Sequence, residues 1–433
     1  MRRPRSRRAV LRAGALGVAA IAGCTASRTE ESPDSSTTSS GGTVPKATTT
    51  DAPQTVTESE TDSEPTTESE PAEETVGVDV RWIAPVGGQI PVPAVDEDTV
   101  YVTSSAGELM AFRTTDGRRR WRSKTGGRWY GPRVADATVY CPTGDTLHAR
   151  ATDDGGKRWA HEWEGNLTSM PTVDGDTVYV GNTDRATYHG EGSAYPEDLF
   201  ALATSDGSVR WKRALANELG GAPVAADGRL YVQTGSSKVY ALDPTDGTTI
   251  WQTSEVSVYG GAVGGLVVVD GTLVASAGNY LVGLDPSSGD VPWRFNTTAT
   301  EIISNDGTAI APVTDGQRVY AGHLEVTGTE TTLYALDPTK GEEHWSKTIP
   351  GLVGSLSAHD GTLYVSATEA TNDDGKTEFY GGPTTLYAFD ASGDEQWRFK
   401  RTSEGFSQAV VADDVVYVGG RNDDGRLYAL TPI

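Results

Sequence analysis

Cys24 is the residue whose surroundings most clearly imply a chemical reaction. It follows an apolar run over residues 13–23, which is too short to span a bilayer but suits the hydrophobic region of a signal peptide. The run ends in small residues, and twin arginines, Arg7 and Arg8, precede it as in Tat export signals. The pattern predicts a Tat-type lipoprotein signal peptide over residues 1–23, with cleavage before Cys24 and lipid attachment to its sulfur. The alternative is an ordinary signal peptide followed by a chance cysteine.

Catalytic motifs do not stand out elsewhere in the sequence. The six histidines are scattered without the HxH or HExxH spacing of metal sites, and GxSxG, P-loop and CxxCH patterns do not occur. Cys141 follows Tyr140 in a strand-like run and is interpreted as a small buried apolar residue. Residues 372–375 and 422–425 both read NDDG, but adjacent carboxylates in an extended segment point apart, so turn formation is favoured over calcium binding. We therefore predict no catalytic residue and no metal site.

Aromatic side chains in predicted loops are the remaining candidates for function. Aromatic anchors close to an arginine suit a protein or glycan surface, and the alternative is that these side chains pack their own loops. The candidate binding-face residues are Arg128, Trp129, Tyr130, Trp163, Tyr188, Tyr195, Tyr259, Phe379 and Tyr380, and Phe406 belongs to the same group. Two candidate N-glycosylation sites, Asn166 and Asn296, also fall in predicted loops.

A sequence motif that the chain repeats predicts the strands that position these loops. ALDPTDGTTIW at 241–251 has six near-copies, each ending in tryptophan, with glycine four positions earlier. Glycine permits the positive φ of a tight hairpin, and aspartate before it favours the same turn. Each phrase therefore reads as a turn between two strands. The tryptophans are Trp121, Trp159, Trp211, Trp251, Trp293, Trp345 and Trp397.

A second hairpin precedes each phrase, as in PTVDGDTVYV at 171–180. Its period-two alternation indicates strands with one buried face. Each unit then has four strands, and eight units can be counted. The eighth lacks its last strand at the C-terminus, and the segment around Trp82 supplies it. The sequence predicts an all-β, eight-bladed β-propeller over residues 77–433, closed by pairing of its two ends. A row of β-sandwich domains is the alternative, which the split unit disfavours.

The AxDxxxGxxxW phrase resembles the tryptophan-docking repeat of PQQ-like (pyrroloquinoline quinone) quinoprotein propellers over residues 78–433. The resemblance implies that Trp82 and the seven repeat tryptophans dock against neighbouring blades. One branch of that family contains PQQ- and calcium-dependent dehydrogenases. The other contains quinone-free scaffolds, such as the BamB-like propeller lipoprotein of the bacterial barrel-assembly machinery. The lipoprotein signal resembles the second branch. The adjacent cysteines of the dehydrogenases have no counterpart in Cys24 and Cys141, and their calcium ligands and catalytic aspartate find no matching positions.

Residues 24–76 are rich in Thr, Ser, Glu and Pro and almost lack large apolar side chains. Such a segment cannot offset its ordering entropy, so we predict a disordered acidic stalk. The net charge of −24 argues against nucleic acid and anionic lipid as partners. With only nine lysines among 36 basic residues, the composition is similar to that of proteins from halophilic archaea.

Together these patterns predict an extracytoplasmic monomer, anchored through a lipid on Cys24 to the outer face of the cytoplasmic membrane. It would act as a protein-binding or assembly scaffold without a cofactor, through a protein or glycan partner on the long-loop face. The alternatives are a PQQ- and Ca²⁺-dependent dehydrogenase and a glycan- or ligand-sensing propeller.

Overall fold

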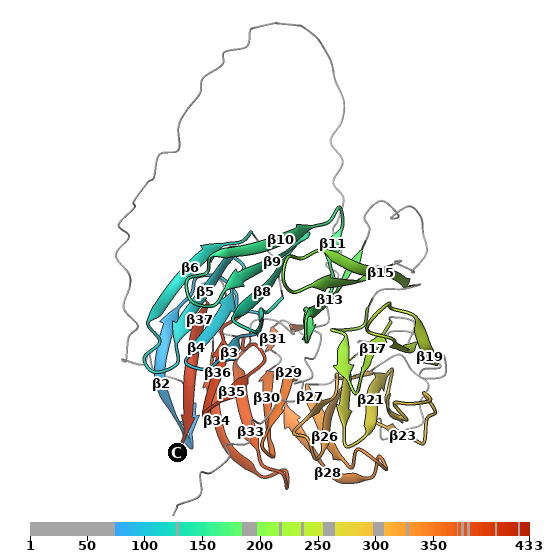
Figure 1. Ribbon diagram of the computed structural model, residues 1–433. Helices are drawn as coiled ribbons and strands as arrows, with labels where there is room; N and C mark the ends of the chain where they lie inside the picture. The colour runs from blue at the N-terminus through green and yellow to red at the C-terminus, as the bar shows by residue number, and fades with distance from the viewer. Residues whose placement is uncertain are drawn as a thin grey trace, which may run out of the picture.

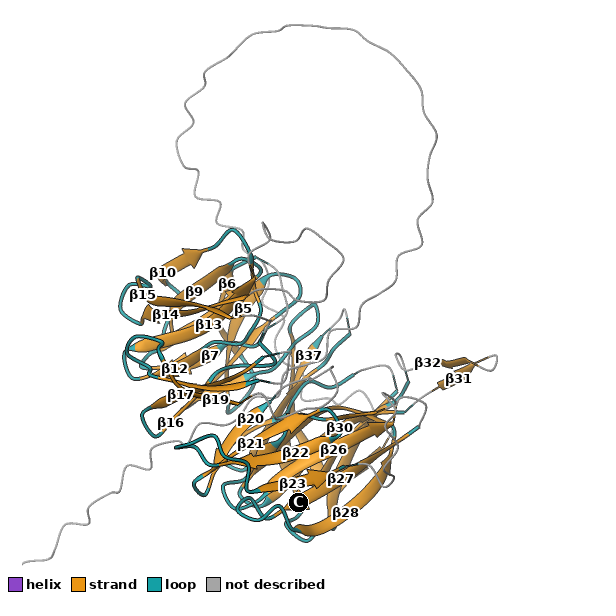
Figure 2. Cartoon of the chain, turned by 90° about the vertical axis from the view of Figure 1, so that its right-hand side faces the viewer, coloured by secondary structure: helices purple, strands orange, loops and turns teal. Residues whose placement is uncertain are grey.

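The computed structural model describes residues 74–126, 130–183, 197–215, 219–234, 238–253, 265–297, 307–325, 329–369, 371–373, 376–378, 382–402, 405–422 and 425–433. The signal peptide, Cys24 and the stalk up to residue 73 lie outside these ranges. The described residues form strands, turns and loops, and no helix is drawn in Figure 2.

Eight antiparallel sheets of four or five strands are present among the described residues, one for each predicted blade. Blades 1 and 2 contain β3 (Ala94–Asp96), β4 (Thr99–Thr103), β5 (Glu108–Arg113) and β6 (Arg119–Lys124), then β7 (Arg133–Ala135), β8 (Thr138–Thr143), β9 (Thr146–Ala151) and β10 (Lys157–Glu162). Blades 3 and 4 contain β11 (Asn166–Leu167), β12 (Thr172–Asp174), β13 (Thr177–Thr183), β14 (Glu197–Ala203) and β15 (Val209–Leu215), then β16 (Val224–Ala226), β17 (Arg229–Gln233), β18 (Val239–Leu242) and β19 (Thr249–Thr253).

The second half repeats this order. Blades 5 and 6 contain β20 (Leu266–Val269), β21 (Thr272–Ala277), β22 (Tyr280–Leu284) and β23 (Trp293–Asn296), then β24 (Gly307–Ala309), β25 (Val313–Thr314), β26 (Val319–Glu325), β27 (Glu330–Leu336) and β28 (Glu343–Pro350). Blade 7 contains β29 (Leu352–His359), β30 (Thr362–Thr368), β33 (Thr384–Phe389) and β34 (Glu395–Arg401), with the hairpin of β31 (Thr371–Asp373) and β32 (Lys376–Glu378) inserted. Blade 8 contains β35 (Val410–Ala412), β36 (Val415–Gly419), β37 (Arg426–Pro432) and β2 (Val78–Pro85).

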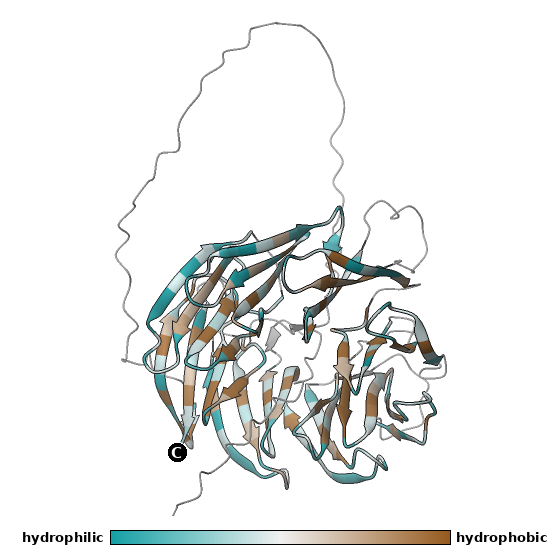
Figure 3. Cartoon of the chain, viewed as in Figure 1, coloured by the Kyte–Doolittle hydropathy of each residue, from teal (hydrophilic) through white to brown (hydrophobic). Residues whose placement is uncertain are grey.

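The two middle strands of each blade form its buried core. In β4, β17 and β36 nearly every side chain is buried, because both faces of a blade pack against neighbouring blades. The outer strands instead alternate, as in β6, where half-buried and exposed residues follow one another. Figure 3 shows this difference as brown inner strands and largely teal outer strands. Apolar burial between blades thus holds the ring together.

Each outer-strand tryptophan spans the gap to the next blade. Seven indole N–H groups, all except that of Trp397, donate to a backbone carbonyl of the next blade's outer hairpin at 2.8–3.1 Å. The indole of Trp159, for example, lies so close to Gly207 that an added Cβ would come within 3.0 Å of it. In seven blades a tyrosine of the second strand packs on the same blade's tryptophan, with ring centroids 5.9–6.1 Å apart. Blade 5 lacks this tyrosine, and Trp293 there contacts Gly283 closely.

The ring closes where the two ends of the described chain meet. Strand β2 pairs antiparallel with β37, from Val78 opposite Pro432 to Pro85 opposite Arg426, and Figure 1 shows the blue and red strands side by side. The backbone N–H of Ile433 donates to the Gly77 carbonyl at 3.1 Å. The eight-bladed propeller and its closure through the segment around Trp82 are therefore confirmed.

One strand begins earlier than the sequence predicted. Residues Glu74–Val76, assigned above to the disordered stalk, form β1 and pair with the outer strand β34 of blade 7. Glu74 lies opposite Lys400 in this pairing and its carboxylate is 3.5 Å from Arg398. Both cations also have closer partners within the propeller, since Arg398 lies 2.9 Å from Glu395 and Lys400 lies 2.7 Å from Glu369. Backbone pairing with an open sheet edge therefore holds these residues, and Glu74 adds one longer ion pair.

Replacing a turn glycine that contacts an indole should cost more stability than replacing a turn glycine with open space around it. Gly207 (φ +73°) contacts Trp159, whereas Gly228 (φ +71°) has no atom within 4 Å of an added Cβ. Both alanine variants should lose about 1–2 kcal/mol from left-handed backbone strain. Gly207→Ala should lose a further 1–3 kcal/mol or so, because the indole must move. Urea unfolding measures both, and equal losses would contradict this account of docking.

Trp82 and Trp397 allow the indole hydrogen bond to be measured separately from packing. Both rings are buried, but only Trp82 donates to a carbonyl, that of Thr114, at 2.9 Å. No described residue accepts from Trp397, because the third and fourth strands of blade 8 come from opposite chain ends and share no turn. Trp82→Phe should therefore cost about 1 kcal/mol more than Trp397→Phe in thermal unfolding. A larger loss for Trp397→Phe would refute this assignment.

Candidate functional site

The innermost strands of the blades line a central channel with a cavity of about 140 Å³. Its described walls come from blades 1, 2, 3, 6, 7 and 8 and consist mainly of Val, Ala and Pro side chains. Two polar wall residues are engaged with the backbone: Gln408 Nε2 donates to the Leu356 carbonyl at 2.8 Å, and Thr314 Oγ1 donates to the Arg318 carbonyl at 2.7 Å. The channel is therefore a narrow and largely apolar space.

Arg133 is the exception in this wall. Among the residues that the structure describes, no carboxylate or carbonyl is paired with its guanidinium. The side chain keeps some accessible surface inside the channel, yet burial lowers its pKa below the ordinary value. It lies opposite Tyr140, and the matching positions opposite Tyr101, Tyr179 and Tyr231 hold small or apolar residues. A guanidinium in such surroundings suits a single carboxylate or phosphate anion.

Acidic residues surround one end of the innermost strands. Each blade carries at least one acid in the turn after its first strand, and several of these residues have positive φ, such as Asp227 at 50° and Asp270 at 45°. Two-residue hairpins require this backbone conformation, which aspartate tolerates. Burial, and then the nearby charges of Glu97 and Asp98, raise the pKa of Asp96. Turn geometry thus accounts for these acids, and the resulting face repels anions.

The outer hairpins use aspartate in a second way. In blade 4, Asp243 Oδ1 accepts from the backbone N–H and the hydroxyl of Thr245, at 2.8 and 2.6 Å. These bonds hold the pKa of Asp243 below its ordinary value, and Asp285, Asp337 and Asp390 are held low by the same arrangement. The aspartates of the repeat are therefore engaged in turn formation.

The described members of the predicted binding face pack against the body of the protein. The Tyr130 hydroxyl donates to the Thr168 carbonyl at 2.9 Å. The Trp163 ring lies 4.2 Å from His161 and 5.4 Å from Phe200, between ring centroids, and its N–H is buried without a partner. Phe406 is 2% exposed, so its assignment to the candidate binding face was wrong. The other members, Arg128, Trp129, Tyr188, Tyr195, Tyr259, Phe379 and Tyr380, lie outside the described residues.

The two candidate glycosylation sites are strand residues and not loop residues. Asn166 begins β11 and lies opposite Thr183, and Asn296 ends β23 opposite Tyr280. The loop prediction failed because the strands of blades 3 and 5 extend further than the turn residues indicated. Whether either asparagine carries a glycan stays a prediction.

A calcium site needs several converging oxygen ligands. The described residues contain no group of three or more His, Cys, Asp or Glu side chains that could hold a metal ion. In the NDDG segments, Asp373 lies opposite Lys376 across a hairpin, and Gly425 N–H donates to the Asn422 carbonyl at 3.1 Å, as expected for turns. Burial raises the pKa of the Cys141 thiol to about 12. The 140 Å³ cavity is also smaller than the roughly 300 Å³ at which ligand pockets begin.

Two features of the structure were not found from the sequence. Arg133 could have been noticed by aligning the first strands on the tyrosine opposite them. The second feature is the basic outer strand β6, RRWRSK. The net charge of −24 does not show a local group of cations.

No helix among the described residues has the length and apolarity needed to cross a membrane.

A family model described as outer membrane protein assembly factor BamB matches residues 54–185, 144–372 and 307–433. The assembly factor BamB of Yersinia pestis is 28% identical over 207 residues, 46% of this chain. The crystal structure of BamB from Moraxella catarrhalis superimposes with a TM-score of 0.56 and 18% identity, over 81% of this chain and 97% of that one. A quinohemoprotein alcohol dehydrogenase from Pseudomonas putida HK5 gives a TM-score of 0.60 and 12% identity, over 82% and 76%. Identities this low in solved structures show the fold alone.

The chain spans about half the length of the curated relatives it matches. The shares are 48% for the Yersinia protein and 54% for a tetrathionate hydrolase of Acidithiobacillus ferrooxidans, which is 24% identical over 68% of this chain. The relatives thus include an assembly factor and a hydrolase on one fold, so fold similarity does not decide activity.

Removing the charge of Arg133 should not destabilise the protein. Because no described carboxylate compensates the desolvated guanidinium, Arg133→Met should leave stability unchanged or raise it by up to about 2 kcal/mol. Arg210→Met is the control, since Arg210 pairs with Asp176 at 2.6 Å on the surface and should lose about 0–1 kcal/mol. Thermal unfolding at low salt measures both. A loss above about 1 kcal/mol for Arg133→Met would mean that the guanidinium has a stabilising partner.

Proposed function

This chain belongs to the family described as outer membrane protein assembly factor BamB, and from that premise we propose that it is a lipid-anchored, extracytoplasmic propeller that acts as a scaffold for a protein partner. In this proposal Cys24 carries the lipid, and the acidic stalk separates the propeller from the outer face of the cytoplasmic membrane. Family membership supports the scaffold role. The anchor rests on the sequence pattern around Cys24.

The observation that carries the proposal is the insertion between β30 and β33. Strands β31 and β32 form a separate hairpin that belongs to none of the blades, and Figure 2 shows it standing clear of the sheets. A projecting element on a rigid ring is a usual place for protein binding. The central channel, in contrast, offers a small apolar cavity with one guanidinium.

Site-specific photo-crosslinking in native membranes tests the scaffold role. A crosslinking residue at Thr371 or Lys376, in the hairpin, should capture one membrane protein. The same residue at Ser288, in the outer hairpin between β22 and β23, is the control and should capture little. Replacing residues 370–381 with a short Gly-Ser linker should abolish capture while the unfolding temperature stays unchanged. Equal capture from both positions, or from neither, would contradict the proposal.

Two further measurements separate the parts of the proposal. Cys24→Ser should release the protein from membranes if the thiol carries the anchor, without altering partner binding in detergent. Addition of PQQ and Ca²⁺ to the purified protein should yield neither a quinone absorbance band nor dye-linked alcohol oxidation. Oxidation at a substantial rate would replace the scaffold by a dehydrogenase.

A further inference from the structure

Five of the residues that line the central channel share one position in the repeat. Each lies on the innermost strand of its blade, opposite the tyrosine of the second strand. They are Ala94, Arg133, Val313, Ser357 and Val410. Three of the five are apolar. The two polar residues, Arg133 in blade 2 and Ser357 in blade 7, therefore distinguish this layer from an ordinary apolar core.

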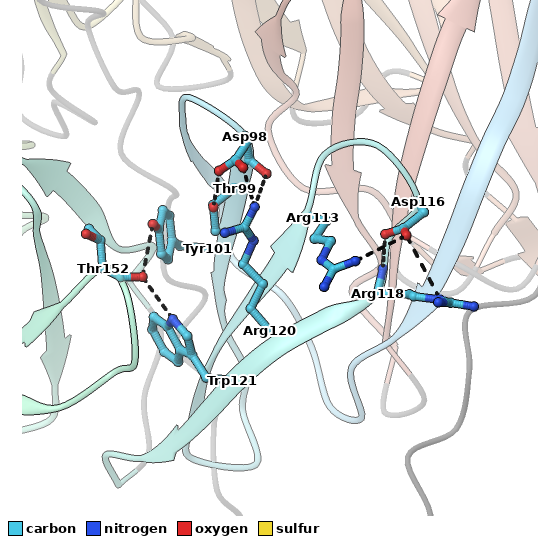
Figure 4. A network of polar contacts seen from close by, with 9 residues as sticks. All are labelled: Asp98, Thr99, Tyr101, Arg113, Asp116, Arg118, Arg120, Trp121 and Thr152. Atoms are coloured by element: carbon cyan, nitrogen blue, oxygen red, sulfur yellow. Dashed lines mark hydrogen bonds and ion pairs between the residues drawn. The ribbon is translucent and has the colours of Figure 1, made fainter.

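Arg133 differs from the arginines of the neighbouring blade 1 in having no acidic partner. There Arg120 forms an ion pair with Asp98, and Arg113 lies 3.8 Å from Asp116, as Figure 4 shows. In the part of the chain that the structure describes, no acid or carbonyl is paired with Arg133, although burial lowers the pKa of its guanidinium. A buried cation of this kind gains most from an anion that enters the channel.

Ser357 is the second polar group of this layer without a partner. Its Oγ is buried, and no described residue forms a hydrogen bond with it. The other polar side chains of the wall are engaged. Gln408 and Thr314 donate to backbone carbonyls, and His359 Nε2 lies 3.6 Å from Asp360 Oδ2. Because a buried hydroxyl without a partner costs free energy, a polar ligand atom in the cavity stabilises it.

The volume of the cavity limits the size of a ligand. At about 140 Å³, it is close to the roughly 150 Å³ of an engineered apolar cavity that binds benzene. A molecule of about six non-hydrogen atoms therefore fits, whereas a fused-ring quinone is several times too large. The wall around the two polar groups consists of Val, Ala and Pro side chains. A fitting ligand thus has one polar head and a short apolar body.

The charge of the wall selects among small anions. A carboxylate has one negative charge and two oxygens in the spacing of the guanidinium fork, so it compensates Arg133 and accepts two hydrogen bonds. Sulfate and doubly ionised phosphate would leave a negative charge in apolar surroundings. The acids of the turns at one end, such as Asp96 and Asp227, oppose a second negative charge as well. A monocarboxylate is the anion that this layer fits best.

We propose that the central channel binds one small aliphatic monocarboxylate, whose oxygens accept hydrogen bonds from the Arg133 guanidinium and the Ser357 hydroxyl and whose apolar body contacts Val313 and Val410. Blades 8 and 1 separate blade 2 from blade 7, so the bound ligand connects blades that share no strand pairing. Binding therefore also stabilises the closed ring. The site uses neither the β31–β32 hairpin nor Cys24, so it is independent of the scaffold role.

Titration of the purified full chain with isobutyrate tests the site. Isobutyrate has about as many non-hydrogen atoms as benzene. In a buffer free of other carboxylates, calorimetry should give a dissociation constant of about 1 mM or lower, and the unfolding temperature should rise with ligand concentration. Isobutyramide, the neutral analogue of the same shape, should bind at least about 10-fold more weakly, and sulfate should do the same.

Substitutions in the wall locate the binding site. Arg133→Met, for which no loss of stability is expected, should weaken isobutyrate binding at least about 10-fold. Ser357→Ala should weaken it about 2–10-fold. Val410→Phe keeps the guanidinium but fills the cavity, so it should abolish binding. Arg210→Met removes a paired surface arginine and is the matched control, which should bind like the unmodified chain.

Three outcomes would overturn the proposal. Absence of binding at about 50 mM isobutyrate would mean that the channel does not admit the ligand. Equal affinity of Arg133→Met and the unmodified chain would place the carboxylate outside the channel. Equal affinity for isobutyrate and isobutyramide would mean that the cavity binds apolar molecules without recognising their charge.

Discussion

The contact between an outer-strand indole and the turn glycine of the next blade, which every docking tryptophan except Trp397 makes, is the constraint on which this propeller depends. The ring of Trp159 occupies the space where any side chain at position 207 would stand, and its N–H satisfies the carbonyl of Thr204. The contact fixes the distance and the angle between neighbouring blades at once, because packing and a directional hydrogen bond act on the same hairpin. Repetition of this contact around the chain sets the curvature that a ring of eight blades needs.

Closure of the ring by β2 leaves the inner strands packed and the outer strands of the blades as open sheet edges. Once β2 completes blade 8, the inner strands of the described blades line a cavity of about 140 Å³. The outer strands, in contrast, remain sheet edges, and their surface charges decide what can approach them. Partner proteins on such a ring are therefore expected at insertions and edges more than in the centre. The projecting β31–β32 hairpin and the basic strand β6 are the two described places of this kind.

The charge of the molecule has two separate physical origins. Turns with positive φ favour aspartate, and Asp227 is an example. Turns in which a side chain accepts a backbone hydrogen bond also favour aspartate, and Asp243 is an example. The cations are concentrated on outer strands such as β6, where long side chains keep their charges in water. The net value of −24 does not show this separation.

The sequence by itself determined the repeat, the number of blades and the closing pair. These features depend on local patterns: a Trp four residues after a turn Gly, and alternation in strands that include Tyr179 and Tyr231. Only the tertiary structure decided which side chains face one another. It placed Phe406 in the core, Asn166 and Asn296 in strands, Arg133 in the channel and β1 on blade 7. A side chain's exposure and its partners depend on segments far away in the chain, and no local pattern contains that information.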